Sequence, residues 1–178
     1  MKSPHARARL FPVLLGLAGL VLTGCLETEY TLGPRDASTV DRAYCGDWML
    51  SRKDEKGRTQ NSHLVVRNLN DREYYVEWSD VNGKPEDRTR DLAFVAEVKG
   101  VSFAHLQQLG EDGNNAEKFI IFRFGMEGEK LVIRELNDTF FKEQNITSDE
   151  QLRKVVEENL ENKEMYAGEP LVGTRQTR

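Results

Sequence analysis

The side chain with the clearest chemistry in this sequence is the thiol of Cys25, because of the residues that precede it. A thiol becomes a nucleophile when it is deprotonated. The stretch from Leu10 to Cys25 reads LFPVLLGLAGLVLTGC, an uncharged apolar run that follows the basic residues Lys2, Arg7 and Arg9. A basic start, an apolar centre and small residues before a cleavage point are typical of a secretory signal peptide. The sequence therefore predicts a signal peptide over residues 1–24 and Cys25 as the first residue of the mature chain.

The last four residues of this run, Leu22-Thr23-Gly24-Cys25, resemble the lipobox of bacterial lipoproteins. The resemblance implies a diacylglyceryl group on the Cys25 sulfur, cleavage after Gly24 and acylation of the new amino terminus, with chains such as palmitate. Cys25 would then be a lipidation site and not a catalyst. Two or three acyl chains give stable membrane binding, since each buried methylene contributes about 0.8 kcal/mol. In Gram-negative lipoproteins, an Asp directly after the lipidated cysteine is associated with retention in the inner membrane. This sequence has Leu26 at that position, so the resemblance implies the periplasmic side of the outer membrane if the source is a Gram-negative bacterium.

Two other interpretations of the amino terminus remain open at this point. The apolar run from Leu10 to Gly24 has fifteen residues, whereas a helix needs roughly 20 apolar residues to span a hydrocarbon core about 30 Å thick. A permanent transmembrane helix is therefore the weaker interpretation. An ordinary secretory signal that is cut near Gly24, with a cysteine following by chance, is the other.

Charge and length limit the classes of function. The formal net charge is −5 for 178 residues, and loss of residues 1–24 removes three basic residues and no acid, leaving −8 on the mature chain. Nucleic-acid binding needs clustered Lys and Arg, so this balance argues against it. Anionic head groups would also repel the chain, so we expect membrane attachment through lipid alone. A mature chain of this length fits one domain with a single core.

The pattern after residue 43 predicts a mainly β domain over residues 44–165. Apolar and aromatic runs of strand length alternate with turn signals such as Asn82-Gly83, Lys99-Gly100 and Gly125–Glu129. In the run Glu73–Ser79, apolar and polar residues alternate with the period of two of a half-buried strand. About seven or eight strands joined by short turns favour an antiparallel up-and-down meander that forms a barrel or a sandwich.

Three other segments complete the predicted organisation. Residues 25–43 contain Gly33-Pro34 and lack periodicity, so we expect a lipidated flexible tether with a reach of roughly 25 Å. A capping box and an apolar stripe predict one C-terminal amphipathic helix at about residues 148–162, packed on the barrel as a lid. Residues 166–178 are expected to be a loose tail.

The mature sequence has few residues arranged for catalysis. His63 and His105 are isolated in strand-like runs, and neither has a second histidine or a cysteine at the spacing of a zinc site. No serine lies in a G-x-S-x-G elbow, and no glycine-rich phosphate loop is present. Cys45, alone once Cys25 carries lipid, is interpreted as a buried structural thiol. We therefore expect no enzyme activity, no metal and no cofactor.

The triplet Gly46-Asp47-Trp48 resembles the Gly-x-Trp that closes the barrel base in lipocalins, and the strand rhythm with a terminal helix is similar to lipocalin-like or calycin-like envelope lipoproteins. The resemblance lacks the paired cysteines and the longer chain of that family. In a lipocalin-like carrier of a small apolar ligand, aromatic residues would line the pocket: Trp48, Tyr74, Trp78, Phe119 and Phe122.

Two functions follow as the main hypotheses, and a third, a hydrolase, would need His63 or His105 to meet a carboxylate in space. The first is a non-catalytic, membrane-anchored envelope lipoprotein that acts through contact with another envelope component, such as a protein partner. The alternative is the lipocalin-like carrier. Cavity volume separates them, because ligand pockets have volumes of about 300 Å³ or more. An empty barrel favours the carrier, and a filled one favours the interaction protein.

Overall fold

A computed structural model describes residues 25–54, 56–84, 87–110 and 114–177, so the predicted signal peptide lies outside the described residues. The described chain is mainly antiparallel β-structure, as the sequence predicts. Its strands are β1 (Glu27–Thr28), β2 (Gly46–Lys53), β3 (Thr59–Asn68), β4 (Tyr74–Asp80), β5 (Thr89–Val98), β6 (Val101–Gln108), β7 (Phe119–Glu127), β8 (Lys130–Leu136) and β9 (Tyr166–Arg175).

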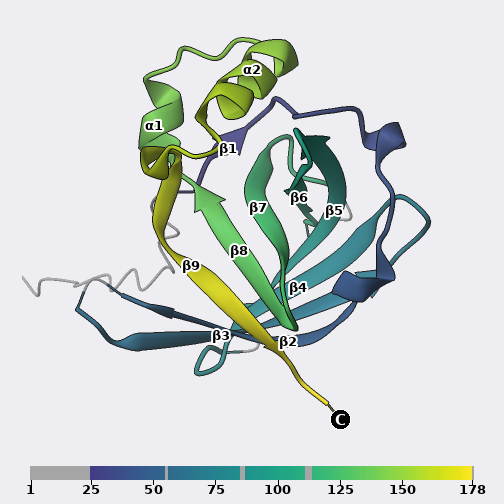
Figure 1. Cartoon of the computed structure of the whole chain (residues 1–178). Helices are drawn as coiled ribbons and strands as arrows, with labels where there is room; N and C mark the ends of the chain where they lie inside the picture. The colour runs from purple at the N-terminus through teal and green to yellow at the C-terminus, as the bar shows by residue number, and fades with distance from the viewer. Residues whose placement is uncertain (1–24, 55, 85–86, 111–113, 178) are drawn as a thin grey trace, which may run out of the picture.

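The strands from β2 to β9 form a closed eight-stranded barrel (Figure 1). Each strand pairs with the next in antiparallel register, and the pairing of β2 with β9 closes the ring. The short strand β1 adds to the start of β7 outside the ring. The meander prediction is thus confirmed, and between the two forms left open the fold is a barrel.

The hairpin turns follow their sequence signals. Lys99 and Gly100 join β5 to β6 with φ angles of 50° and 77°, so both residues adopt the left-handed conformation that a two-residue hairpin turn needs. Their flanking residues, Val98 and Val101, form the last pair of the ladder. The predicted hairpin around Lys99-Gly100 is therefore confirmed.

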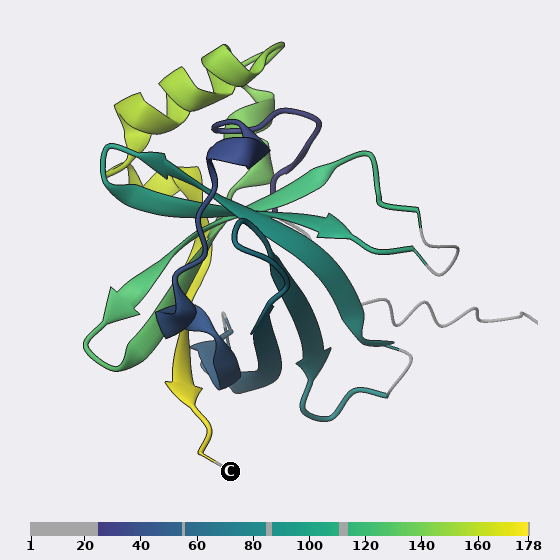
Figure 2. The same cartoon turned by 90° about the vertical axis from the view of Figure 1, so that its right-hand side faces the viewer.

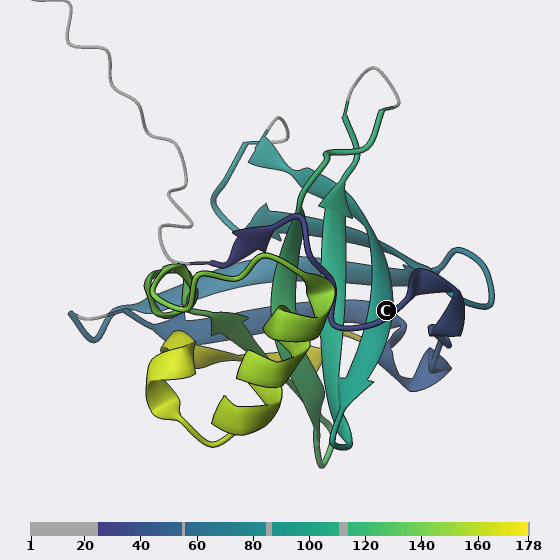
Figure 3. The same cartoon turned by 90° about the horizontal axis from the view of Figure 1, so that it is seen from above.

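Two α-helices lie together beyond one end of the barrel (Figures 1 and 3): α1 (Asp138–Lys142) and α2 (Asp149–Asn159). The Ser148 hydroxyl caps α2 by accepting a hydrogen bond from the Gln151 amide at 3.2 Å. Leu152 and Val156 on the apolar stripe are fully buried. The predicted amphipathic helix is present, and α1 is a short helix that the sequence analysis did not predict.

Residues 26–44, termed the strap, are packed against the barrel, so the flexible tether predicted for residues 25–43 is wrong. The strap contains two short 3₁₀ turns, Arg35–Ala37 and Arg42–Tyr44, and runs from the helices to the start of β2 (Figure 2). Leu32 is 1% exposed, and its amide donates to Nε2 of His105 at 2.9 Å. The Ser38 hydroxyl donates to the Arg72 carbonyl at 2.7 Å. These partners are distant in sequence, which explains why composition alone indicated a tether.

The loose tail predicted for residues 166–178 is also wrong, because residues 166–175 form β9. This strand pairs with β8 along most of its length and with β2 at its end, where Trp48 is the partner of Arg175. The register shifts between the pairs of Ile133 and Glu135 with β9. Gly168, with φ of 63°, and Pro170 lie in this irregular part of the strand. Both residues weaken the sequence signal of a strand, yet a bulge accommodates them.

Two apolar clusters result from this architecture. One fills the barrel, and the other lies between the outside of β5–β7 and the layer made by the strap and the helices. Strand β5 contributes to both, since Ala93 belongs to the first cluster and Phe94 and Ala96 face the opposite side. The outer layer therefore leaves only part of the barrel surface uncovered.

Candidate functional site

The interior of the barrel is apolar and nearly filled. Three of the five aromatic residues predicted to line a pocket, Tyr74, Trp78 and Phe122, face this interior. Trp78 and Phe122 stack with their ring centroids 6.1 Å apart. The remaining cavity has a volume of about 70 Å³ and no polar lining. This volume is well below that of a pocket for a small organic ligand.

Trp48 does not line the cavity, which corrects the pocket prediction. It is fully buried and closes the end of the barrel at which β2 begins and β9 ends. Its indole Nε1 donates to the Tyr44 carbonyl at 3.0 Å, and the Arg175 guanidinium lies 4.4 Å from the ring centroid. Arg175 also donates to the carbonyls of Cys45 and Ala43. The contact therefore joins the first and last barrel strands to the end of the strap.

Phe119 does not line the cavity either. It packs in the outer cluster, in an edge-to-face contact with Phe94 at 5.7 Å. His105 lies against the same ring of Phe94, stacked at 4.5 Å. Burial lowers the pKa of His105 to about 4, so at neutral pH its neutral Nε2 accepts the bond from the strap. His105 is thus a structural residue of the outer layer.

Cys25 lies at the opposite end of the barrel from Trp48. It forms a bridge with Asn137, and the next amide, that of Leu26, donates to the Leu136 carbonyl at 2.9 Å. Burial, with the negative charge of Glu135 as a second cause, raises the pKa of the Cys25 thiol to about 12. Glu135 itself forms an ion pair with Arg52 at 3.0 Å. The predicted lipidation site is therefore tied directly to the barrel.

Cys45 is free and only partly buried, so the expectation of a buried thiol holds in part. Within the described residues, no three His, Cys, Asp or Glu side chains are close enough to hold a metal ion. In the same residues, no helix is long and apolar enough to cross a membrane.

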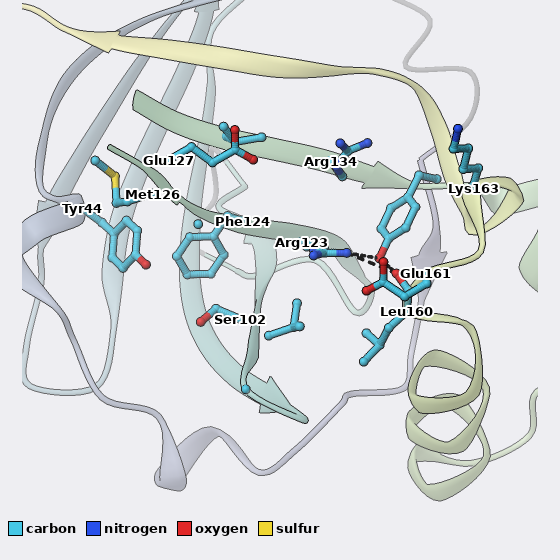
Figure 4. A pocket seen from close by; sticks show the side chains of 15 residues that line it. Tyr44, Ser102, Arg123, Phe124, Met126, Glu127, Arg134, Leu160, Glu161 and Lys163 are labelled. Carbon is cyan, nitrogen blue, oxygen red and sulfur yellow. Dashed lines mark hydrogen bonds between the residues drawn. The ribbon is translucent and has the colours of Figure 1, made fainter. Parts of the chain in front are cut away.

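A groove of about 490 Å³ lies on the side of the barrel, and the sequence analysis did not predict it. The ladder between β6 and β7 ends at the pair Ser102–Phe124. Beyond this pair the β5–β6 and β7–β8 hairpins separate, and the groove occupies the gap between them and the turn after α2. In Figure 4, Arg123, Arg134 and Lys163 lie toward one end of the groove, and Tyr44 and Met126 lie toward the other.

Two arginines on neighbouring strands form the polar end of this groove. Arg123 on β7 and Arg134 on β8 are directly paired, so they project from the same face of the sheet. Their guanidinium carbons lie 5.5 Å and 5.7 Å from the ring centroid of Tyr166. Arg123 donates to the Tyr166 hydroxyl at 2.8 Å and to the Leu160 carbonyl at 3.2 Å. The Arg134 guanidinium makes its ring contact with Tyr166 and has no hydrogen-bond partner among the described residues.

No family model, curated protein or solved structure matches the chain. The barrel interior offers apolar walls with almost no space, and the groove offers space with two adjacent cations. The groove is the better candidate for a binding site.

Sequence patterns could not have located the groove, because it forms only where strand pairing brings β7, β8 and the segment after α2 together. Arg123 and Arg134 are separated by a hairpin turn, and Tyr166 follows the helix. One signal was present. Arg123 lies five residues before Gly128 and Arg134 six residues after it, so a two-residue turn at Gly128-Glu129 places the two arginines opposite each other.

Proposed function

We propose that this protein is a non-catalytic, membrane-anchored envelope lipoprotein that acts by binding another envelope component through the outside of its barrel. The observation that carries the proposal is the residual interior volume of about 70 Å³. Its packing supports the same conclusion: a methyl group added at Gly173 would lie 2.8 Å from Leu50 and 3.2 Å from Leu131. A barrel so filled has no room for a drug-sized or lipid-sized ligand.

The carrier alternative would require the interior side chains to move apart. Trp78, Phe122 and their neighbours fill the volume that a ligand would occupy. Opening a cavity of 300 Å³ or more would cost packing energy, at about 24 cal/mol for each Å³. That cost is several kcal/mol, and a ligand would have to offset it. The interaction function needs no such rearrangement.

The anchoring part of the proposal rests on the lipobox-like residues that end in Cys25. A thiol with a pKa of about 12 is a poor nucleophile, so lipid transfer would take place before the barrel folds around Cys25. The strap is packed, so the anchored barrel would sit close to the bilayer, with the Cys25 end toward it. In a Gram-negative source, Leu26 after the cysteine favours the periplasmic side of the outer membrane.

The test is site-specific photo-crosslinking of the full-length protein in its source cells. A photoreactive residue replaces Lys163 or Glu127, both exposed at the groove. The matched control replaces Asn61, exposed on β3 across the barrel from β7. The proposal predicts a discrete crosslinked product from the groove positions and none from Asn61.

The anchor has a separate control in the same cells. Replacing Cys25 by Ser should move the protein from the membrane fraction to the soluble fraction, whereas Cys45→Ser should leave it in the membrane. If Cys25→Ser stays membrane-bound, the lipoprotein assignment fails. If no envelope component crosslinks to either groove position, the interaction function fails.

A further inference from the structure

The groove at Arg123 and Arg134 has features that select one class of partner. The first is charge. Direct cross-strand neighbours of like charge repel each other and destabilise a sheet, and no described carboxylate lies within 4.0 Å of either guanidinium. The chain as a whole is acidic, with a net charge of −5. A pair of uncompensated arginines on such a surface is suited to an incoming anion.

The acidic residues at the groove do not cancel this pair. Glu127 and Glu161 line it together with Lys163, and both carboxylates belong to exposed residues. Exposed charges are screened by water and salt. Arg123 and Arg134 are instead partly buried against the Tyr166 ring, which holds the two guanidinium groups in place. An ordered guanidinium pair suits the planar, bidentate geometry of a carboxylate.

The second feature is a free strand edge. Beyond its last pair with β6 at Phe124, β7 continues through Gly125, Met126 and Glu127, and these three residues pair with β8 alone. Their other edge faces the groove and has no strand partner in the described part of the chain. An unpaired edge is a template for an added strand.

The third feature is the missing side chain at Gly125. A Cβ atom placed there would have no heavy atom within 4 Å, so open space lies beside Arg123 on the same strand. A glycine within a strand often marks a place where another backbone approaches closely. The Arg123 guanidinium, the open space at Gly125 and the unpaired strand edge therefore lie next to one another along β7.

We propose that this groove binds an extended acidic segment of a protein partner, with a carboxylate held by Arg123 and Arg134 and its backbone paired to the free edge of β7. The inference rests on the proposed function and names its partner chemistry. An anionic lipid surface fits less well, because the free edge of β7 lies at the end of the barrel opposite Cys25, the end that the anchor would hold away from the bilayer. A lipid head group would also make no use of a strand edge.

The binding test uses the full-length protein in nonionic detergent micelles and fluorescence anisotropy of a labelled octapeptide of alternating glutamate and threonine. Wild-type protein should bind this probe, and binding should weaken as salt is raised. Arg134→Gln should weaken binding at least tenfold, since it removes a charge-assisted contact. The matched control, Arg72→Gln at an exposed arginine in the β3–β4 turn, should bind as wild type does.

Two further measurements test the open space beside Arg123 and the class of ligand. Gly125→Leu, which fills open space and should leave the thermal midpoint unchanged, is expected to abolish binding. The same peptide with glutamine in place of glutamate should not bind. Equal binding by wild type and Arg134→Gln, or displacement of the peptide by phosphatidylglycerol vesicles, would overturn the proposal.

The crosslinking experiment distinguishes failure of the acidic-segment inference from failure of the proposed interaction function. If the groove positions crosslink to an envelope component in cells and Arg134→Gln leaves that product unchanged, the interaction function stands and the acidic-segment inference is wrong. If crosslinking disappears with Arg134→Gln and persists with Arg72→Gln, both are supported.

Discussion

Arg123 and Arg134 face each other across the β7–β8 ladder and share the ring of Tyr166, with no described carboxylate within 4.0 Å. Opposed like charges cost stability, and opposite charges at the same positions stabilise a sheet. The fold therefore retains a local destabilisation at the place where we propose that a partner binds.

This relationship predicts that Arg134→Glu stabilises the protein. The new carboxylate would pair with Arg123, and the gain should be about 1 kcal/mol in the free energy of unfolding, measured by urea denaturation. Arg72→Glu serves as the control and should change stability little. A loss of stability in Arg134→Glu would mean that Arg134 contributes mainly through its contact with Tyr166.

His105 should make the free energy of unfolding depend on pH, because its pKa differs between the unfolded and the folded state. Its pKa is 6.5 in an unfolded chain and about 4 in the fold, so the unfolded state binds the extra proton in this window. The contribution of neutral His105 is fully present above pH 6.5 and is lost as the pH falls toward 4, by up to about 3 kcal/mol.

The measurement for His105 compares unfolding curves of wild type and His105→Phe at several pH values. The difference in their stability should shrink as the pH falls from 6.5 to 4. The comparison with a variant is needed because the pKa of buried Asp91 is raised to about 6, so Asp91 favours folding toward low pH and acts in the opposite direction. A difference that is constant across this range contradicts the role given to His105.

Trp48 and Arg175 should be energetically coupled. Trp48→Ala removes a fully buried indole and should cost about 3–5 kcal/mol, and Arg175→Ala should cost less, since Arg175 is largely exposed. A double-mutant cycle, with urea denaturation as the readout, should give a coupling energy of about 1 kcal/mol for the ring contact. Additive effects would mean that Arg175 acts only through the carbonyls of Cys45 and Ala43.

Strand β9 should be essential for folding. A chain that ends at Met165 lacks the strand that pairs with both β2 and β8, so it should show no cooperative thermal unfolding. Removal of Thr177 and Arg178 alone, which follow the strand, is the control and should leave the transition in place. Cooperative unfolding of the shorter chain at the wild-type midpoint would show that closure by β9 is dispensable.

The sequence predicted the elements whose signals are local. The hairpin at Lys99-Gly100 and the helix capped at Ser148 depend on residues close in sequence, and both are present. The strap and β9 depend on distant partners, such as His105 for Leu32 and Trp48 for Arg175. Composition cannot reveal such partners, and both segments were predicted to be unstructured.

The site was predicted less well than the fold for the same reason. The five aromatic residues chosen as pocket lining share a residue type, but strand direction divides them among the interior, the barrel end and the outer cluster. The groove arises where two hairpins separate, and the point of separation is a property of the register. The sequence does not reveal the register between strands, so neither the groove nor the side of the barrel that each aromatic residue faces could be predicted from it.

Because the interior of the barrel is nearly filled, we propose that the protein binds through its outer surface. Native mass spectrometry of the full-length protein, extracted from its source membrane in a mild nonionic detergent, tests this most directly. We expect the mass of the chain that begins at Cys25 with its covalent lipid, and no further mass. A reproducible additional mass in the range of a fatty acid or phospholipid, removed by organic extraction while the covalent lipid remains, would contradict it and identify a carrier.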